Sequence, residues 1–387
     1  MIKWIFALLL SIGFAYADSC PSRNHIFLIH GIGGSEKTFG EMDHYLEKIN
    51  PCYVATFFNY ATGDSTQSTY NFSDSLDDFI EKTLMRNSFG PEDRISFIMH
   101  SQGGLIGSIW LIQARMSENP LYKKVDSFIT LSTPFYGSKI ARLGQQFLFA
   151  FPNVDNPVAP MGRIELNEMS YGSPTIHAIQ SNFSAIFENT HIRFLAIGGV
   201  KNISSPEVGE GDTTVTVYSS NPNHYSNILK INGSDKVQNR LFVVPFTTVK
   251  ATHIPTTLPG IAKIEKDCLE KVVCDHPSID HIVNQLKNPK YRPALQNNGF
   301  KKYRLHVYVK GETDDIITAR IVTPDGKFFK LNFDKINDQL RSTFFHNYAK
   351  HSVPGEMKVE FFINKKLVKS TKVTVQGGFS SFITLSL

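Results

Sequence analysis

One heptapeptide in this sequence has the composition of a nucleophilic site. Ser101 stands in the run Ile98-Met-His-Ser-Gln-Gly-Gly104, between a short apolar segment and a long apolar one. A serine on a sharp strand-to-helix turn holds its hydroxyl clear of neighbouring side chains, and the helix N-terminus adds positive partial charge. We therefore predict that Ser101 is the nucleophile of an acyl-transfer reaction.

A second segment supplies groups that could stabilise negative charge. The glycine-rich run Leu28-Ile-His-Gly-Ile-Gly-Gly-Ser35 follows a short apolar stretch. Such a loop can direct a backbone N–H at a reacting carbonyl oxygen, and we predict an oxyanion hole formed by the N–H groups of Ile32 and Gln102. The run lacks the Gly-Lys-Ser/Thr ending of a phosphate-binding loop and the spacing of a dinucleotide site, so phosphate binding is rejected.

The surrounding pattern predicts the elements that hold these segments. Apolar strands alternate with helical periodicity from Ile26 to about Leu286, which indicates a mainly parallel sheet covered by helices on both faces. Strands are expected at residues 26–29, 53–58, 95–99, 125–131, 192–197 and 241–245, and helices at 39–49, 76–84, 102–116 and 279–286.

Two regions depart from this alternation. Residues 137–190 are predicted to form a cap insert, whose apolar stripe suits either an acyl-chain wall or ordinary packing of a cap helix. Residues 300–387 contain several period-two strands and the turn Pro324-Asp-Gly326, so we expect an all-β domain of sandwich size there. The stripe in the insert consists of Ile140, Leu143, Phe147 and Phe151.

Composition and charge narrow the classes of protein. Of 387 residues, 41% are hydrophobic and 19% charged, which excludes a disordered chain or a coiled coil. The net charge is +5, and no dense basic run supports nucleic-acid binding. From residue 301 onward Lys and Arg exceed Asp and Glu by 15 to 8. This basic β-domain could contact an anionic membrane or cell surface, or could be a solvated structural domain.

The N-terminus predicts export. Lys3, an apolar run from Trp4 to Phe14 and the sequence Ala15-Tyr-Ala17 describe a secretory signal peptide over residues 1–17, so the mature protein is expected to be secreted or periplasmic. Export favours disulfides among the four cysteines, which allow three pairings. The pairing Cys20–Cys52 with Cys268–Cys274 is favoured over the alternatives and over a metal site.

The sequence resembles the α/β-hydrolase superfamily, and within it secreted bacterial lipases and esterases. The resemblance covers about residues 24–288, so the domains are expected to be a catalytic domain at 18–290 and a β-sandwich at 300–387. Met99 departs from the family pattern, because a glycine usually stands there and a large side chain requires a shifted neighbour. Four stretches carry the resemblance: His30-Gly-Ile-Gly-Gly34, His100-Ser-Gln-Gly-Gly104, Leu131-Ser-Thr-Pro-Phe-Tyr-Gly-Ser138 and Gly211-Asp-Thr-Thr-Val-Thr-Val-Tyr-Ser219.

The resemblance implies a Ser-Asp-His triad in that chain order. Asp212 follows a predicted strand where the family places its acid, and Asp235 is the weaker candidate. His253 follows the last sheet strand and is favoured as the base over His276. Two further histidines have other expected roles: His30 shapes its loop, and His100 points away from the site.

The expected reaction is hydrolysis of a lipid ester through an acyl-enzyme, with no metal or organic cofactor required. Triacylglycerol and phospholipid are not distinguished. An acyltransferase could use the same triad, and a catalytically weak lipid- or cell-surface-binding protein is the non-enzyme alternative. The oligomeric state is left open.

Overall fold

The computed structural model describes residues 20–64, 66–138, 141, 162–188, 190–200, 210–212, 214–235, 237–251, 253, 277–293, 299–346 and 353–387. The expected signal peptide, the apolar stripe of the insert and the pair Cys268–Cys274 lie outside these residues. These three features therefore stay predictions.

The N-terminal two thirds of the chain are built on a parallel six-stranded sheet, with strand order β2-β1-β3-β4-β5-β8. Its strands are short apolar runs, and in β1 every residue from Ile26 to Ile29 is at most 1% exposed. Burial on both faces is typical of parallel sheets in α/β proteins. The strands are β1 (Asn24–Ile29), β2 (Tyr53–Phe58), β3 (Arg94–His100), β4 (Val125–Leu131), β5 (Arg193–Gly199) and β8 (Phe246–Val249).

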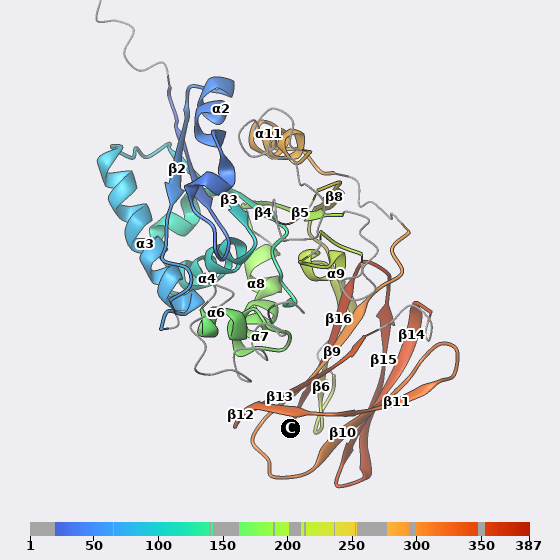
Figure 1. Cartoon of the computed structure of the whole chain (residues 1–387). Helices are drawn as coiled ribbons and strands as arrows, with labels where there is room; N and C mark the ends of the chain where they lie inside the picture. The colour runs from blue at the N-terminus through green and yellow to red at the C-terminus, as the bar shows by residue number, and fades with distance from the viewer. Residues whose placement is uncertain are drawn as a thin grey trace, which may run out of the picture.

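Helices cover both faces of this sheet (Figure 1). On one face the core includes α3 (Thr69–Arg86), α4 (Gln102–Met116), α7 (Pro174–Ser181) and α8 (Phe183–Phe187). On the other it includes α2 (Met42–Ile49) and α11 (Ile279–Lys287). Within the described ranges, no helix is both long and apolar enough to cross a bilayer. The short elements are η1 (Glu36–Phe39), η2 (Pro120–Lys124), α6 (Arg163–Glu168) and α9 (Val217–Ser220).

The C-terminal region forms two further sheets that share one apolar core. The expected β-structure is therefore present, with more strands than the sequence pattern indicated. One sheet has the order β11-β10-β14-β15, made of Phe328–Asn332, Ile317–Val322, Gly355–Ile363 and Lys366–Val375. The other has the order β12-β13-β9-β16-β6-β7, made of Asp334–Asn337, Leu340–His346, Arg304–Lys310, Ser380–Ser386, His224–Lys230 and Val237–Phe242.

The prediction of a parallel-sheet strand at 241–245 is wrong. Its first two residues end β7 in the C-terminal sheet, and the parallel sheet resumes only at β8, after Pro245. Phe242 and Val244 are buried while Leu241 and Val243 are 40% and 56% exposed, so this run is not buried on both faces. Proline also has no N–H for a central sheet ladder.

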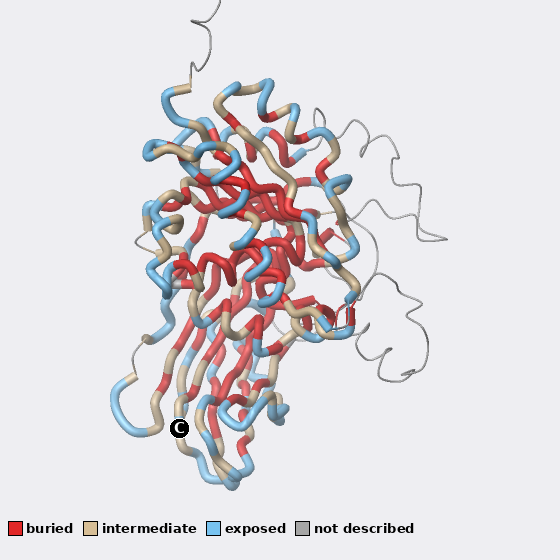
Figure 2. The backbone as a smooth tube through the Cα atoms, turned by 90° about the vertical axis from the view of Figure 1, so that its left-hand side faces the viewer, coloured by how far each residue is buried: buried red, intermediate tan, exposed pale blue. Residues whose placement is uncertain are grey.

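The β6–β7 hairpin joins the two parts of the molecule. It lies in the sequence between β5 and β8, yet β6 pairs in parallel with β16 over seven residue pairs. Nearby, the Ser380 hydroxyl donates to the Tyr218 carbonyl at 2.7 Å, and the Asn221 amide donates to the Gly378 carbonyl at 2.9 Å. Buried segments run continuously from the parallel sheet into the β-region in Figure 2.

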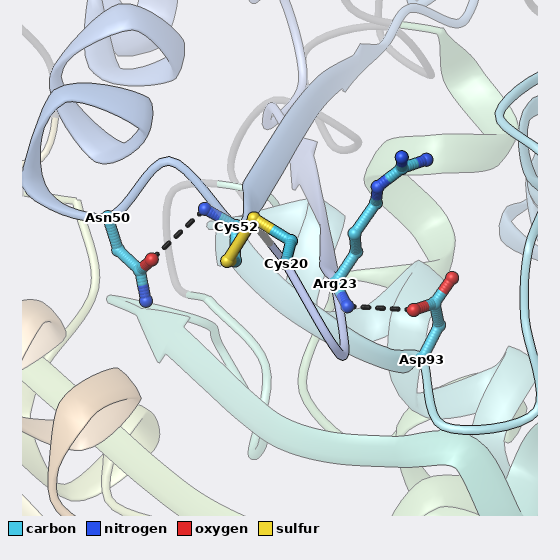
Figure 3. Close-up of a disulfide and its surroundings, with 5 residues drawn as sticks. All are labelled: Cys20, Arg23, Asn50, Cys52 and Asp93. Atoms are coloured by element: carbon cyan, nitrogen blue, oxygen red, sulfur yellow. Dashed lines mark hydrogen bonds between the residues drawn. A yellow bond between two sulfur atoms is a disulfide. The ribbon is translucent and has the colours of Figure 1, made fainter. Parts of the chain in front are cut away.

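A disulfide between Cys20 and Cys52 ties the start of the described chain to the beginning of β2 (Figure 3). Around it the Asn24 N–H donates to the Cys52 carbonyl at 2.9 Å, and the Arg23 N–H donates to the Asp93 carboxylate at 2.7 Å. The sequence prediction of this pair is confirmed. Since the bond spans 32 residues, chain-entropy arguments assign it about 3–4 kcal/mol of stability.

Helix α4 packs closely on the sheet because Gly107 faces Met99. The Met99 side chain is fully buried, and a Cβ at Gly107 would overlap its sulfur. Room for the large Met99 side chain is thus left by a glycine about one and a half turns into α4.

Gly107→Ala is expected to destabilise the fold. The better helix propensity of alanine would raise the free energy of unfolding by about 1 kcal/mol. Overpacking against Met99 lowers it by about 1–3 kcal/mol, so the net effect is a loss of stability. Urea unfolding of G107A, M99A and the double variant would measure this. Destabilisation in the double variant should be smaller than the sum of the two single changes, since the shortened side chain leaves room for the new methyl group. Strict additivity would contradict the contact.

His224 predicts a loss of stability in acid. It is 4% exposed, and its Nδ1 lies 2.8 Å from the Tyr136 hydroxyl. Burial lowers its pKa to about 4 from the usual 6.5. Because the unfolded chain takes up this proton first, stability should fall between pH 6.5 and about 4, by about 3 kcal/mol from this group.

The measurement is the free energy of unfolding at pH 7 and pH 4.5 for the wild type and His224→Asn. The variant should lose less stability in acid than the wild type. Substitution of the exposed His44 on α2 serves as control and should leave the difference between the two pH values unchanged. An unaltered pH dependence in H224N would exclude this role.

Candidate active site

Ser101 occupies the turn between β3 and α4 in a strained conformation. Its φ is 54° and its ψ is −123°, values that are rare for a residue with a side chain. The Ser101 N–H donates to the Leu131 carbonyl at the end of β4, at 2.9 Å, and α4 begins at the next residue. Strain of this kind is held by the surrounding structure and is concentrated at functional sites.

The structure brings Ser101, His253 and Asp212 into one hydrogen-bonded chain. His253 Nε2 lies 2.8 Å from the Ser101 Oγ, and His253 Nδ1 lies 2.7 Å from an Asp212 carboxylate oxygen. All three residues are at most 8% exposed. With the proton on Nδ1, the imidazole donates to the carboxylate and accepts from the serine hydroxyl, so it can take the serine proton.

The backbone also holds the acid and the imidazole together. The His253 N–H donates to the Asp212 carbonyl at 2.8 Å. The other Asp212 carboxylate oxygen accepts from the N–H groups of Val215 at 2.7 Å and Thr214 at 3.1 Å. The short turn after Asp212 therefore orients its carboxylate.

Asp212 is ionised in this setting. Burial by itself raises its pKa, but the His253 imidazole and the hydrogen bonds from Ser132 and the Val215 N–H act in the opposite direction. Together these effects keep the pKa of the Asp212 carboxyl below its ordinary value. A buried carboxylate in this state stabilises an imidazolium beside it.

The two rival triad positions have other surroundings. Asp235 lies after β6, in the turn of the β6–β7 hairpin, and forms an ion pair with Lys369 of β15 at 2.9 Å. The turn thereby links two strands of the C-terminal region. His276 lies outside the described residues.

The two predicted oxyanion donors come from the turns that follow β1 and β3. Gln102 is the first residue of α4, and Ile32 is in the glycine-rich turn after β1. That turn contacts the nucleophile directly, since a Cβ at Gly31 would stand 2.7 Å from the Ser101 Cβ. The parallel order of β1 and β3 places both turns at one sheet edge.

Of the two neighbouring histidines, His30 has the predicted role and His100 does not. His30 shapes its turn, because its Nδ1 lies 2.9 Å from the Gly31 carbonyl and its ring stacks on Tyr60 with centroids 4.4 Å apart. His100 does not point away from the site as expected. Its ring lies against the His253 ring, with centroids 4.7 Å apart, and its Nδ1 lies beside Gly31, so it packs between the glycine-rich turn and the imidazole.

Sequence reasoning missed three residues around this site. Ser132, at φ 50°, donates its N–H to the Ile197 carbonyl at 2.7 Å and bonds to Asp212. The Tyr60 hydroxyl donates to the Gln102 Oε1 at 3.1 Å, and Glu165 of α6 accepts from the N–H groups of Gly63 at 3.1 Å and Gly162 at 3.0 Å. Only Ser132 had a sequence signal, its place in the Leu131–Ser138 stretch. Within the described residues there is no group of three or more metal-binding side chains.

Comparisons with known proteins agree with this fold. Residues 21–154 match a family described as "Putative serine esterase (DUF676)". The structure is similar to the phospholipase PlaB of Legionella pneumophila in complex with thio-NAD, at 14% identity and a TM-score of 0.66, covering 94% of this chain and 93% of that one. A second structure of PlaB gives 15% identity and a TM-score of 0.65 with the same coverage.

A lipase of Bacillus licheniformis, BlEst2 in its propeptide form, is a more distant match. It has 16% identity and a TM-score of 0.45, covering 92% of this chain and 74% of that one. No curated protein sequence matches the chain. The parallel sheet with its serine turn and the similarity to PlaB show an α/β-hydrolase fold, and residues 21–154 match the serine-esterase family.

Proposed function

We propose that this protein is a serine ester hydrolase acting on lipid esters. The observation that carries the proposal is the hydrogen-bonded chain from the Ser101 hydroxyl through His253 to Asp212. Each member has the chemistry its place requires: a nucleophile on a helix N-terminus, an imidazole and an ionised buried acid.

The reaction would proceed by acyl transfer to water. His253 Nε2 takes the Ser101 proton as Oγ attacks the ester carbonyl, and Asp212 stabilises the imidazolium. The imidazolium then gives its proton to the leaving alcohol. Water, deprotonated by the same imidazole, releases the acid from the acyl-enzyme.

The oxyanion would be held by the backbone N–H groups of Ile32 and Gln102. A donor of this kind typically contributes about 3 kcal/mol, because it meets negative charge that develops only in the transition state. The position of Gln102 at the first turn of α4 adds the helix dipole to that effect.

A phospholipid is the substrate we place second. The favouring observation is that the similar structure described as a phospholipase matches 94% of this chain, the C-terminal β-region included. A lipid acyltransferase would require an alcohol in place of water.

We further propose that the protein acts outside the cytoplasm and near an anionic surface. The Cys20–Cys52 disulfide fits an oxidising compartment, as the proposed signal peptide at 1–17 requires. Residues 301–387 contain 15 Lys and Arg but only 8 Asp and Glu. This positive charge would attract the β-region to anionic lipid.

Substitutions in the triad test the catalytic assignment. Ser101→Ala should abolish hydrolysis of p-nitrophenyl acyl esters, and Asp212→Asn and His253→Ala should each lower kcat by about 10³-fold or more. A fluorophosphonate should label Ser101 in the wild type, as peptide mapping would show. Full turnover in S101A, or a label on another residue alone, would overturn the assignment.

The substrate class is tested with lipids in their natural form. Hydrolysis of triacylglycerol emulsions and phosphatidylcholine vesicles should be compared at equal surface area, with S101A as the blank. A lipid ester of either class should be cleaved, and the ratio of rates decides between them. Cleavage of neither lipid would restrict the function to small esters.

Adding phosphatidylglycerol should increase vesicle binding at low salt and less at high salt.

A further inference from the structure

The turn that carries Asp212 is a small hydrogen-bonded hairpin. The Glu210 carbonyl accepts from the Val217 N–H at 2.8 Å, and the Asp212 N–H donates to the Val215 carbonyl at 3.1 Å. Gly211 has no room for a side chain, since a Cβ there would stand 2.3 Å from the Val215 carbonyl oxygen. So closed a turn moves as one unit, and the direction of the Asp212 carboxylate therefore depends on how its two open ends are held.

One open end of this turn is tied to the C-terminal β-region by the side chain of Glu210. Both carboxylate oxygens lie 3.0 Å from the Lys301 N–H nitrogen, and one of them also accepts from the Lys302 N–H at 3.1 Å. These two residues come just before β9, 91 and 92 residues further along the chain. Hydrogen bonds to a charged acceptor are stronger than those between neutral groups, so this carboxylate is a firm attachment.

The other open end is tied to the same region by a backbone carbonyl. Tyr218, on α9, accepts from the Ser380 hydroxyl at 2.7 Å, and both residues are buried. Strands β9 and β16 are parallel neighbours with Arg304 opposite Ser380, so the two attachments come from the same end of one strand pair. The Asp212 turn is therefore held on both sides by segments that the C-terminal β-region positions.

We propose that Glu210 is a positioning residue for the catalytic acid, acting through the turn that carries Asp212. This inference rests on the proposed function. Loss of the Glu210 attachment frees one end of the turn, so the Asp212 carboxylate can move away from the His253 imidazole. A displacement of about 1 Å at a catalytic group is enough to lower the rate strongly, because the reaction depends on geometry that is set beforehand. The C-terminal β-region thereby takes part in setting the geometry of the triad.

The β6–β7 hairpin offers a matched control. Asp235 is another carboxylate between β5 and β8 that attaches this part of the chain to the C-terminal strands. It pairs with Lys369 of β15 at 2.9 Å and accepts from the Gln238 amide of β7 at 3.3 Å. Loss of Asp235 therefore weakens the same junction without removing a contact of the Asp212 turn.

The first experiment compares Glu210→Ala with Asp235→Ala in the full chain, on a soluble p-nitrophenyl ester. E210A should lower kcat about 10-fold or more with KM within about twofold of the wild type, because the acid acts in the transition state and not in substrate binding. Its loss should stay below that of Asp212→Asn, since the carboxylate is displaced but not removed. D235A should keep kcat within about threefold. Equal losses in both variants, or a change in KM alone, would overturn the proposal.

Two milder substitutions test the hydrogen bonds themselves. One oxygen of Glu210 already accepts from both N–H groups, so Glu210→Gln can keep both bonds and should hold kcat within about threefold of the wild type. Glu210→Asp keeps the charge but withdraws the acceptor by about 1.5 Å, so its kcat should fall toward that of E210A. E210D also keeps the test open if E210A folds poorly. A loss in E210Q as large as in E210A, or full activity in E210D, would exclude the role of these bonds.

The second experiment asks whether Glu210 acts through Asp212. In an Asp212→Asn background the charge that Glu210 positions is gone, so E210A should cause less than about threefold additional loss of kcat. The residual rate is measured with S101A as the blank. Fully multiplicative effects of E210A and D212N would mean that Glu210 acts elsewhere and would contradict the coupling.

Labelling separates this inference from the proposed function. If a fluorophosphonate fails to label Ser101 in the wild type, the proposed function fails. If it labels the wild type and E210A turns over normally, only the role of Glu210 fails. The extent of labelling also counts the sites that are folded and competent, so kcat is expressed per labelled site. A defect of E210A that disappears on this scale would show partial unfolding in place of positioning and would overturn the proposal.

Discussion

The turn at Ser101 is the constraint on which the rest of the site depends. A serine at φ 54° is unfavourable in isolation, so the turn persists only because the elements around it leave no alternative. The Leu131 carbonyl holds its N–H, and the fit of Met99 into the space at Gly107 brings α4 close to β3. The helix begins at the residue after the serine.

The acid and the imidazole reach this turn through an indirect path in the chain. Between Asp212 and His253 the chain leaves the parallel sheet, forms the β6–β7 hairpin, and returns as β8. Within this excursion β6 pairs with β16, and nearby the hydroxyl of Ser380 holds the carbonyl of Tyr218. The C-terminal region therefore supports the segment that carries the acid, and its packing contributes to the position of two side chains of the site.

Much of the parallel-sheet part could be predicted because its signals are local. A short apolar run such as Ile26–Ile29 is consistent with a strand buried on both faces, and the glycines after Ser101 allow a helix to start abruptly. The pair Cys20–Cys52 followed from an even cysteine count in a chain with a predicted export signal. Less could be predicted of the β-region: the short polar strand β12 has no apolar alternation, and β6 and β7 carry no mark of the sheet they join.

By itself, then, the sequence indicated the strand-to-helix turn at Ser101, the alternation of parallel strands with helices and the first disulfide, because these follow from local residue types, from periodicity and from the cysteine count. Only the tertiary structure decided that Asp235 pairs with Lys369 while Asp212 meets His253, and that His100 lies against the imidazole. The hydrogen bond from the Gly63 N–H to Glu165 of the insert was likewise invisible, since 102 residues separate them and no local pattern marks a buried carboxylate. Such contacts depend on where the insert and the hairpin pack, which is decided by burial over the whole molecule.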